Sequence, residues 1–160
     1  MTNKLNNPEF IPFLLRSKRN TYAASNTAAG AANIVSPSRT ASHDLAYQEG
    51  DFTYLDTYLG GYAFAGEEAV WHCGEPLWGM NYYGTMTVPE IPEGFGDFLK
   101  KAILQVPSEA PYRGPAFFQE DRFTYACSWQ GDLAFFTGSE SISYDGKEIY
   151  KLVFHGGVVI

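Results

Sequence analysis

The sequence has few residues that bind metals or cross-link chains: two cysteines, Cys73 and Cys127, and three histidines among 160 residues. One cysteine falls in an expected turn and the other in an expected strand, so we expect no structural disulfide. The scattered cysteines and histidines also show no zinc-ligand spacing. We therefore expect no bound metal and no cofactor.

Basic residues are scarce as well, with 11 Lys and Arg against 18 Asp and Glu, which leaves a net charge of −7. The only basic run is Arg16, Lys18 and Arg19, and nucleic-acid binding needs a larger clustered basic face. No apolar run approaches the ~20 residues that span a bilayer, and the N-terminus lacks a leader pattern. We expect a soluble, cytoplasmic protein without direct nucleic-acid or membrane binding, folded as one domain over residues 1–160.

Aromatic residues are abundant (12 Phe, 11 Tyr and 3 Trp), and many occur in a stretch that is found twice. Residues 52–84 return in altered form at 123–156, where FTY again opens the segment. A helix with apolar residues at i, i+3 and i+4 is predicted before each copy, over residues 8–22 and 92–107. Each copy is divided into three strands by turn signals such as Asp-Gly.

These patterns predict an α+β fold made by internal duplication of a helix plus a three-stranded antiparallel meander. The pseudo-repeats would be residues 8–86 and 91–160, giving about six main strands and two helices.

Period-two alternation places Asp56 on the same strand face as Tyr54 and Tyr58, a face that is otherwise aromatic. If the hairpins pair as their turns suggest, Tyr54 lies near Glu68, and Asp56 lies near Gly66 and Tyr82. An acid on a buried face is costly unless it is hydrogen-bonded. We therefore predict an aromatic, acid-containing pocket; its expected ligand-binding residues are Tyr54, Asp56, Tyr58, Glu68, Trp78, Tyr82 and Arg113.

Three readings of this pocket stay open. Its acids could bind a polar or cationic ligand among aromatic walls. Asp56 and Glu68 could instead act as acid and base in an enzyme, although no motif names a reaction and we assign no catalytic residue. Each Glu could also serve the fold alone by accepting from a tyrosine hydroxyl or from a bulged backbone next to Gly66 and Gly138. If Asp56 is fully enclosed and hydrogen-bonded, the pocket hypothesis fails.

Residues 23–44 show little periodicity, and we expect either a mobile surface loop or a lid over the ligand. The neighbouring residues Ser42, His43 and Asp44 include the residue types of a hydrolytic triad, but capping of the loop is the better interpretation.

Several motifs give the chain a family resemblance. They include Asp51-Phe52-x-Tyr54-x-Asp56-x-Tyr58-x-Gly60, Trp78-x-Met80-Asn81-Tyr82-Tyr83-Gly84 and Tyr112-Arg113-Gly114-Pro115. With them the chain resembles a bacterial family known only as a domain of unknown function. Its members often follow the helix-turn-helix of XRE-type regulators and also occur alone. The resemblance implies a sensor or effector-binding module, here without a DNA-binding half.

The leading hypothesis is thus a stand-alone module that binds an unknown small molecule, with catalysis not favoured and a homodimer as one possible assembly. The alternatives are an enzyme that uses Asp56 and Glu68, and a protein-interaction module that uses an exposed sheet face.

Overall fold

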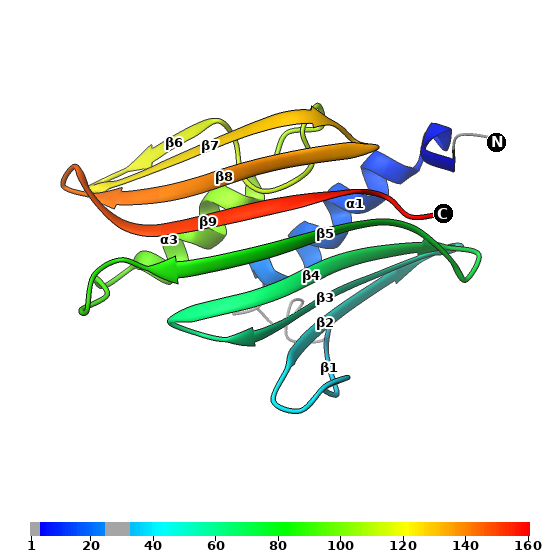
Figure 1. The fold of residues 1–160 in the computed structure, drawn as a ribbon, viewed down its shortest axis with the longest axis horizontal. Helices are drawn as coiled ribbons and strands as arrows, with labels where there is room; N and C mark the ends of the chain where they lie inside the picture. The colour runs from blue at the N-terminus through cyan, green and yellow to red at the C-terminus, as the bar shows by residue number, and fades with distance from the viewer. Residues whose placement is uncertain (1–3, 25–32) are drawn as a thin grey trace.

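The computed structural model describes residues 4–24 and 33–160, and its strands form one nine-stranded antiparallel sheet (Figure 1). Across the sheet the order is β1-β2-β3-β4-β5-β9-β8-β7-β6. The strands are β1 Ile34–Val35, β2 His43–Glu49, β3 Phe52–Gly60, β4 Ala63–His72, β5 Glu75–Met86, β6 Phe117–Glu120, β7 Phe123–Asp132, β8 Phe135–Tyr144 and β9 Lys147–Val158. The helices are η1 Lys4–Asn6, α1 Phe10–Asn20, η2 Tyr22–Ala24 and α3 Phe95–Leu104.

The predicted fold class is therefore wrong. In place of a duplicated α+β unit with about six strands, the described chain forms a nine-stranded antiparallel sheet with only two short α-helices. The sheet is also continuous, because β5 pairs with β9 along nine residue pairs, from Trp78 with Val158 to Met86 with Tyr150.

The additional strands lie where the sequence was interpreted as loop. β2 pairs with β3 along its whole length, but its burial does not alternate, and its two fully buried residues, Asp44 and Leu45, are neighbours. β6 has only four residues and pairs only with β7. Strands that are short or lack alternation give no period-two signal. The expected lid or mobile loop at 23–44 falls partly on residues 25–32, which lie outside the described residues.

Both α-helices lie against the same face of the sheet (Figure 1). They occur where the apolar stripes predicted them, with Phe10, Phe13 and Leu14 of α1 buried and Phe98 and Leu99 of α3 buried. An amphipathic helix must bury its apolar stripe, and here both stripes pack against the aromatic face of the sheet.

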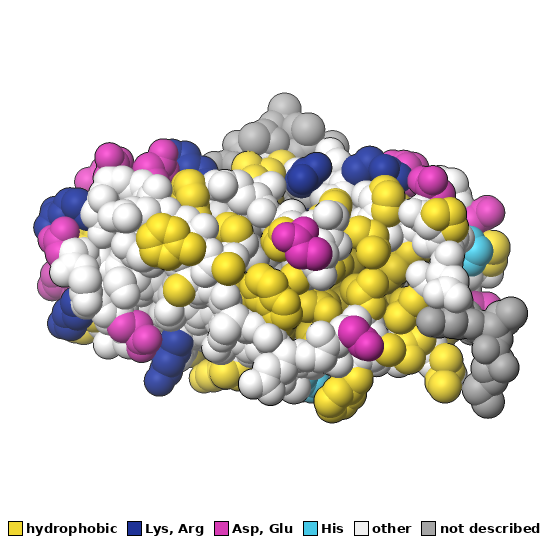
Figure 2. Space-filling model, turned by 90° about the horizontal axis from the view of Figure 1, so that it is seen from above, with side chains coloured by type: hydrophobic (Ala, Val, Ile, Leu, Met, Phe, Trp, Pro, Cys, Tyr) yellow, Lys and Arg dark blue, Asp and Glu magenta, His cyan; other side chains and the backbone are white. Residues whose placement is uncertain are grey.

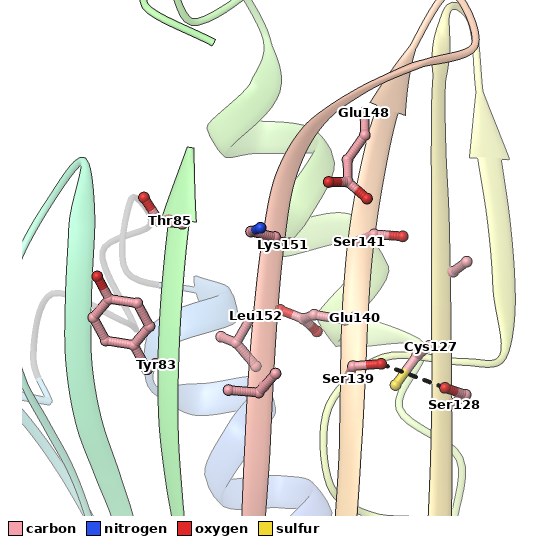
Figure 3. A pocket seen from close by; sticks show the side chains of 12 residues that line it. Tyr83, Thr85, Cys127, Ser128, Ser139, Glu140, Ser141, Glu148, Lys151 and Leu152 are labelled. Carbon is pink, nitrogen blue, oxygen red and sulfur yellow. Dashed lines mark hydrogen bonds between the residues drawn. The ribbon is translucent and has the colours of Figure 1, made fainter. Parts of the chain in front are cut away.

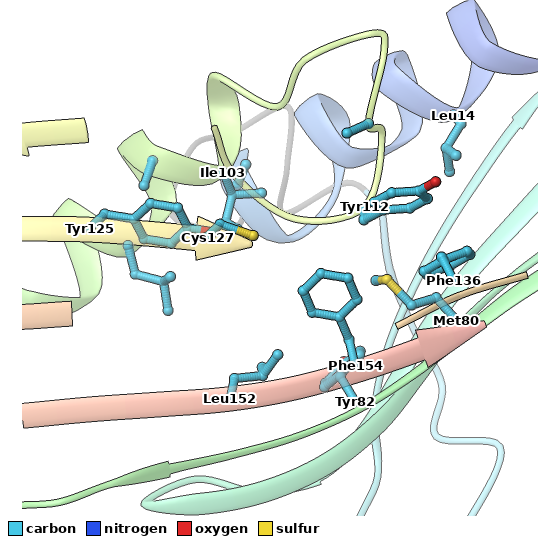
Figure 4. Packing of buried hydrophobic residues seen from close by; sticks show 14 of the residues in the cluster. Leu14, Met80, Tyr82, Ile103, Tyr112, Tyr125, Cys127, Phe136, Leu152 and Phe154 are labelled. Carbon is cyan, nitrogen blue, oxygen red and sulfur yellow. The ribbon is translucent and has the colours of Figure 1, made fainter. Parts of the chain in front are cut away.

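The core between helices and sheet is a continuous set of stacked rings. Trp78 lies 5.5 Å from Phe136, and Phe136 lies 4.0 Å from Tyr112, measured between ring centroids. Figure 4 shows Tyr112 between Leu14 of α1 and the Phe136 side of the sheet. Most of the abundant aromatic residues are accounted for by this packing.

In the described part of the chain no helix lies on the opposite face of the sheet, which carries many small polar side chains. Tyr83 and Val153 are the large residues near its centre, 53% and 59% exposed. Figure 2 looks onto one edge of the sheet, where hydrophobic side chains gather near the middle with acidic groups among them and charged side chains lie at both ends.

The β5–β9 seam requires glycine at position 156. A Cβ atom there would clash with the carbonyl oxygen of Gly79. The same Cβ would lie 2.8 Å from the Cα of Met80 and 2.7 Å from the ring of Phe136. Since two of these three atoms belong to the backbone, they cannot move aside easily.

We predict that Gly156→Ala lowers the free energy of unfolding by about 1–3 kcal/mol, because it overpacks the seam. Urea unfolding measures the change. Gly96→Ala is the matched control, because nothing lies within 4 Å of its new methyl group in α3, and it should leave stability unchanged or raise it by about 0.5–1 kcal/mol. Equal effects of the two substitutions would contradict the packing at the seam.

Candidate functional site

Two buried acids are direct cross-strand neighbours at the centre of the helix-covered face. Asp56 of β3 pairs with Glu68 of β4, and each is 3% exposed. The predicted register, with Tyr54 opposite Glu68, is wrong by two residues, because the turn between the strands is centred on Tyr62 and not on Gly61. The observed register makes Asp56 and Glu68, which the sequence interpretation had placed on one surface, direct cross-strand partners.

Asp56 is bonded to a neutral partner. The hydroxyl of Tyr82 on β5 donates to Asp56 Oδ1 at 2.6 Å. Burial, followed by the negative charge of Glu68, raises the pKa of Asp56 to about 7, although Tyr82, Arg113 and Lys18 act in the other direction. The carboxyl group therefore keeps its proton to a higher pH than a solvated aspartate does.

Glu68 has a cation of its own. Lys18 of α1, 2% exposed, donates from Nζ to Glu68 Oε2 and to the carbonyl oxygen of Tyr112. Burial lowers the pKa of Lys18, and the charge of Glu68 opposes that change. The sequence interpretation had assigned Lys18 to an exposed basic run, but its position four residues after Leu14 continues the buried stripe of the helix.

The third buried acid on this side, Glu140 of β8, is held by Arg113. The guanidinium donates twice, from Nε at 3.1 Å and from Nη2 at 2.7 Å. The hydroxyls of Tyr125 and Tyr150 donate to the same carboxylate at 2.5 and 2.8 Å. Burial alone would raise the pKa of Glu140, but the Arg113 charge and these hydrogen bonds bring it below its usual value.

Beside Asp56 lies a cavity of about 330 Å³ between the helical layer and the sheet, which we call the aromatic cavity. Four of the seven predicted residues line it: Asp56, Tyr58, Tyr82 and Arg113. The other lining residues are Tyr22, His43, Gly60, Gly61, Phe64, Met86, Ile91, Phe95, Leu99 and Tyr150.

The remaining predicted residues, Tyr54, Glu68 and Trp78, are not among the lining residues and are buried in the core. Asp56 itself is nearly enclosed and hydrogen-bonded, and full enclosure would argue against a pocket. Asp56 nevertheless forms part of the cavity wall, so it is not fully enclosed and the condition for rejecting a pocket is met only in part.

Aromatic rings form most of the cavity wall. Tyr58 stacks on His43 with centroids 4.8 Å apart, and Phe64 and Phe95 lie 6.3 and 5.3 Å from Tyr150. Tyr22, His43, Phe64, Phe95 and Tyr150 were not predicted as site residues. Tyr22, His43 and Phe95 lack a local signal, since they reach the cavity from η2, β2 and α3, outside the strands in which the site was predicted.

A comparison with protein families matches residues 56–159 to DUF5680, a domain of unknown function. The chain belongs to this DUF5680 family. The matched region contains all the lining residues except Tyr22 and His43, and it does not include Lys18. No curated protein and no solved structure matches the chain. Among the described residues of this DUF5680 protein, no helix is long and apolar enough to cross a membrane.

A second hollow, of about 420 Å³, opens on the helix-free side, and Figure 3 shows Tyr83 and Thr85 at one edge of it and Ser128 at the other. It is larger than the aromatic cavity but more open, and its wall mixes short hydroxyl side chains with apolar and charged ones. None of the seven predicted residues lines it. Enclosure and convergent polar groups favour the aromatic cavity as the candidate site.

A group of metal-binding residue types was also missed by the spacing analysis. The ligand atoms of Asp51, His72 and Cys73 lie within 4.8 Å of one another where two turns meet. The Cys73 N–H donates to the Asp51 carbonyl at 2.8 Å and holds the turns together. Asp51 lies in the β2–β3 turn, whereas His72 ends β4 and Cys73 begins the next turn, so no local sequence motif could reveal the group.

We predict that Lys18→Met lowers the free energy of unfolding by about 3–5 kcal/mol, because it leaves Glu68 buried and uncompensated next to Asp56. Arg16→Met on the same helix is the control: it breaks the exposed pair with Glu49 and should cost less than about 1 kcal/mol. Adding Glu68→Gln to Lys18→Met should restore much of the loss. Chemical unfolding of the four proteins tests this, and equal losses for the two single variants would refute it.

The raised pKa of Asp56 predicts a pH effect on stability. The folded state holds this proton up to about pH 7, whereas the unfolded chain releases it near pH 3.8. The resulting stabilisation is complete below the unfolded pKa and is lost as the pH rises toward 7. Asp56→Asn should therefore gain stability relative to the wild type by about 1.4 kcal/mol per pH unit between about pH 5 and 7. Thermal unfolding over this range measures the difference, and a difference that is independent of pH would contradict the assignment.

Proposed function

We propose that this DUF5680 chain binds a small organic molecule in the aromatic cavity and acts as a sensor or effector-binding module. The observation that carries the proposal is the convergence of Asp56, Tyr82, Tyr58 and Arg113 on one cavity with aromatic walls. A volume of about 330 Å³ is within the range of small-molecule sites, which combine mostly apolar walls with a few directed polar groups. Asp56 and Tyr82 supply those polar groups here.

Binding is favoured over catalysis by the position of the two acids. An acid and base pair must both reach the substrate. Asp56 borders the cavity, but Glu68 does not, and one of its oxygens accepts from Lys18. The alternative of an enzyme using both residues therefore lacks support from the geometry.

The wider role follows the family resemblance noted in the sequence. We propose that residues 1–160 form one domain that works in the cytoplasm as an effector module, as the association of similar sequences with XRE-type regulators suggests. The continuous sheet supports the single domain. A homodimer and a protein-interaction role that uses an exposed face are the other assignments the experiment below can distinguish.

The test is native mass spectrometry of the protein purified from its own host, compared with its denatured mass. Ile91→Lys is the diagnostic variant, because Ile91 lines the cavity and is 49% exposed, so a charge there obstructs the site without entering the core. Leu104→Lys, at a 40% exposed position of α3 that does not line the cavity, is the control.

We expect a small molecule to accompany the wild type and Leu104→Lys but to be lost from Ile91→Lys. If the wild type carries nothing, a ligand-observed NMR screen of small organic fragments follows, and binding should again be lost in Ile91→Lys alone. Absence of any binder that is sensitive to Ile91→Lys would refute the proposal, and an empty, clean dimer would favour the interaction role.

A further inference from the structure

We propose that the aromatic cavity selects an organic cation, an amine whose charge lies against Asp56 and whose apolar part lies between the rings. This inference rests on the proposed function, because it names the class of ligand for the same cavity. The charges buried beneath the cavity, their pairing and the nature of its walls support it.

Among the described residues, buried acids outnumber buried cations on this side of the sheet. Lys18 and Arg113 are the two cations, and the acids are Glu68, Glu140 and Asp56. The remaining buried acid, Asp44, bonds to the Ser38 N–H and the Thr57 hydroxyl, and strand alternation places it on the other face. When all five groups are ionised, the cluster carries one excess negative charge.

That excess belongs to Asp56. Lys18 donates to Glu68, and Arg113 is engaged with Glu140 through two nitrogens. Asp56 accepts instead from the hydroxyl of Tyr82, which brings no charge. A buried carboxylate without a cation is costly, so it must take up either a proton or a cation from outside.

Among the described groups that face Asp56, no cation donates a hydrogen bond to its carboxylate, which accepts from the Tyr82 hydroxyl. These groups are Glu68 from β4, Tyr82 from β5, Lys18 from α1 and Arg113 from the segment before β6. Three further phenols act on it more weakly, those of Tyr22, Tyr54 and Tyr58. Because burial raises the pKa of each phenol, these groups stay neutral near pH 7.

The cavity walls suit the rest of such a ligand. Phe64, Phe95, Tyr58 and Tyr150 surround the space next to Asp56, and aromatic faces attract ammonium groups as well as apolar ones. An anionic ligand is disfavoured, since Arg113, the one cation among the described lining residues, already donates to Glu140. A neutral ligand would leave the excess charge uncompensated.

The cation and the proton must then compete for Asp56. An amine binds best to the ionised carboxylate, so its affinity should increase with pH across the range in which Asp56 loses its proton. The pKa of about 7 implies roughly a tenfold gain between pH 6 and pH 8. A neutral ligand of the same shape should show no such gain.

The experiment compares 2-phenylethylamine, 2-phenylethanol and 3-phenylpropanoate, which share a phenylethyl group and differ in charge. NMR titration or calorimetry on the whole chain measures their affinities at pH 6 and pH 8. At pH 8 we expect the amine to bind at least tenfold more tightly than the alcohol, and the propanoate to bind most weakly.

Asp56→Asn should reduce the preference for the amine to about twofold or less and remove its pH dependence. The side chain keeps its size and can still accept from Tyr82, so the variant should fold. Glu49→Gln is the control, because Glu49 is an exposed acid on β2 that does not line the cavity, and its selectivity should equal that of the wild type. The pH comparison on the wild type needs no variant at all.

Equal affinities for the amine and the alcohol, or tightest binding of the propanoate, would overturn the inference while leaving the proposed binding function intact. Failure of all three probes to bind at millimolar concentration would also overturn it, because a cavity built for amines should accept the smallest of them. The proposed function itself is refuted only by its own test, if no molecule is found whose binding is lost in Ile91→Lys.

Discussion

The ammonium group of Lys18 is the contact on which the arrangement of this molecule depends. It joins α1 to Glu68 on the sheet and to the carbonyl oxygen of Tyr112, in the segment that carries Arg113. Three parts of the chain are thus positioned by one buried charge. The match to DUF5680 begins at residue 56, so a partner of the matched region comes from a helix that precedes it.

The chemistry of the cavity follows from which acids this arrangement satisfies. Lysine and arginine neutralise the two glutamates, and two tyrosine hydroxyls supply further hydrogen bonds to Glu140. Asp56 receives a hydroxyl only. We therefore infer that the specificity arises because Lys18 and Arg113 pair with the glutamates and not with Asp56. The aromatic rings then determine which ligand cations fit.

Much of this site could be read from the sequence, and the fold only in part. Alternation identified Asp56 as an acid on an aromatic face, and four of the seven predicted residues do line one cavity. The strand register could not be obtained, because one residue of difference in the centre of a turn moves every pair. Lys18 was missed since a charge on a helix is usually solvated, and β2 and β6 were missed because neither shows hydrophobic alternation. That Glu68 and Asp56 share a strand pair was beyond reach for the same reason as the register.

The seam between β5 and β9 also orders events during folding. Each hairpin joins neighbouring residues, whereas the seam joins Met86 to Tyr150 and Trp78 to Val158, far apart in the chain. Closing that long loop costs conformational entropy before any seam contact can form, so pairing at the seam is intrinsically slower than hairpin formation. Since Asp56 and Tyr82 stand on one side of the seam and Tyr150 on the other, no binding cavity exists until it closes. The ligand binding that we propose therefore requires a closed seam.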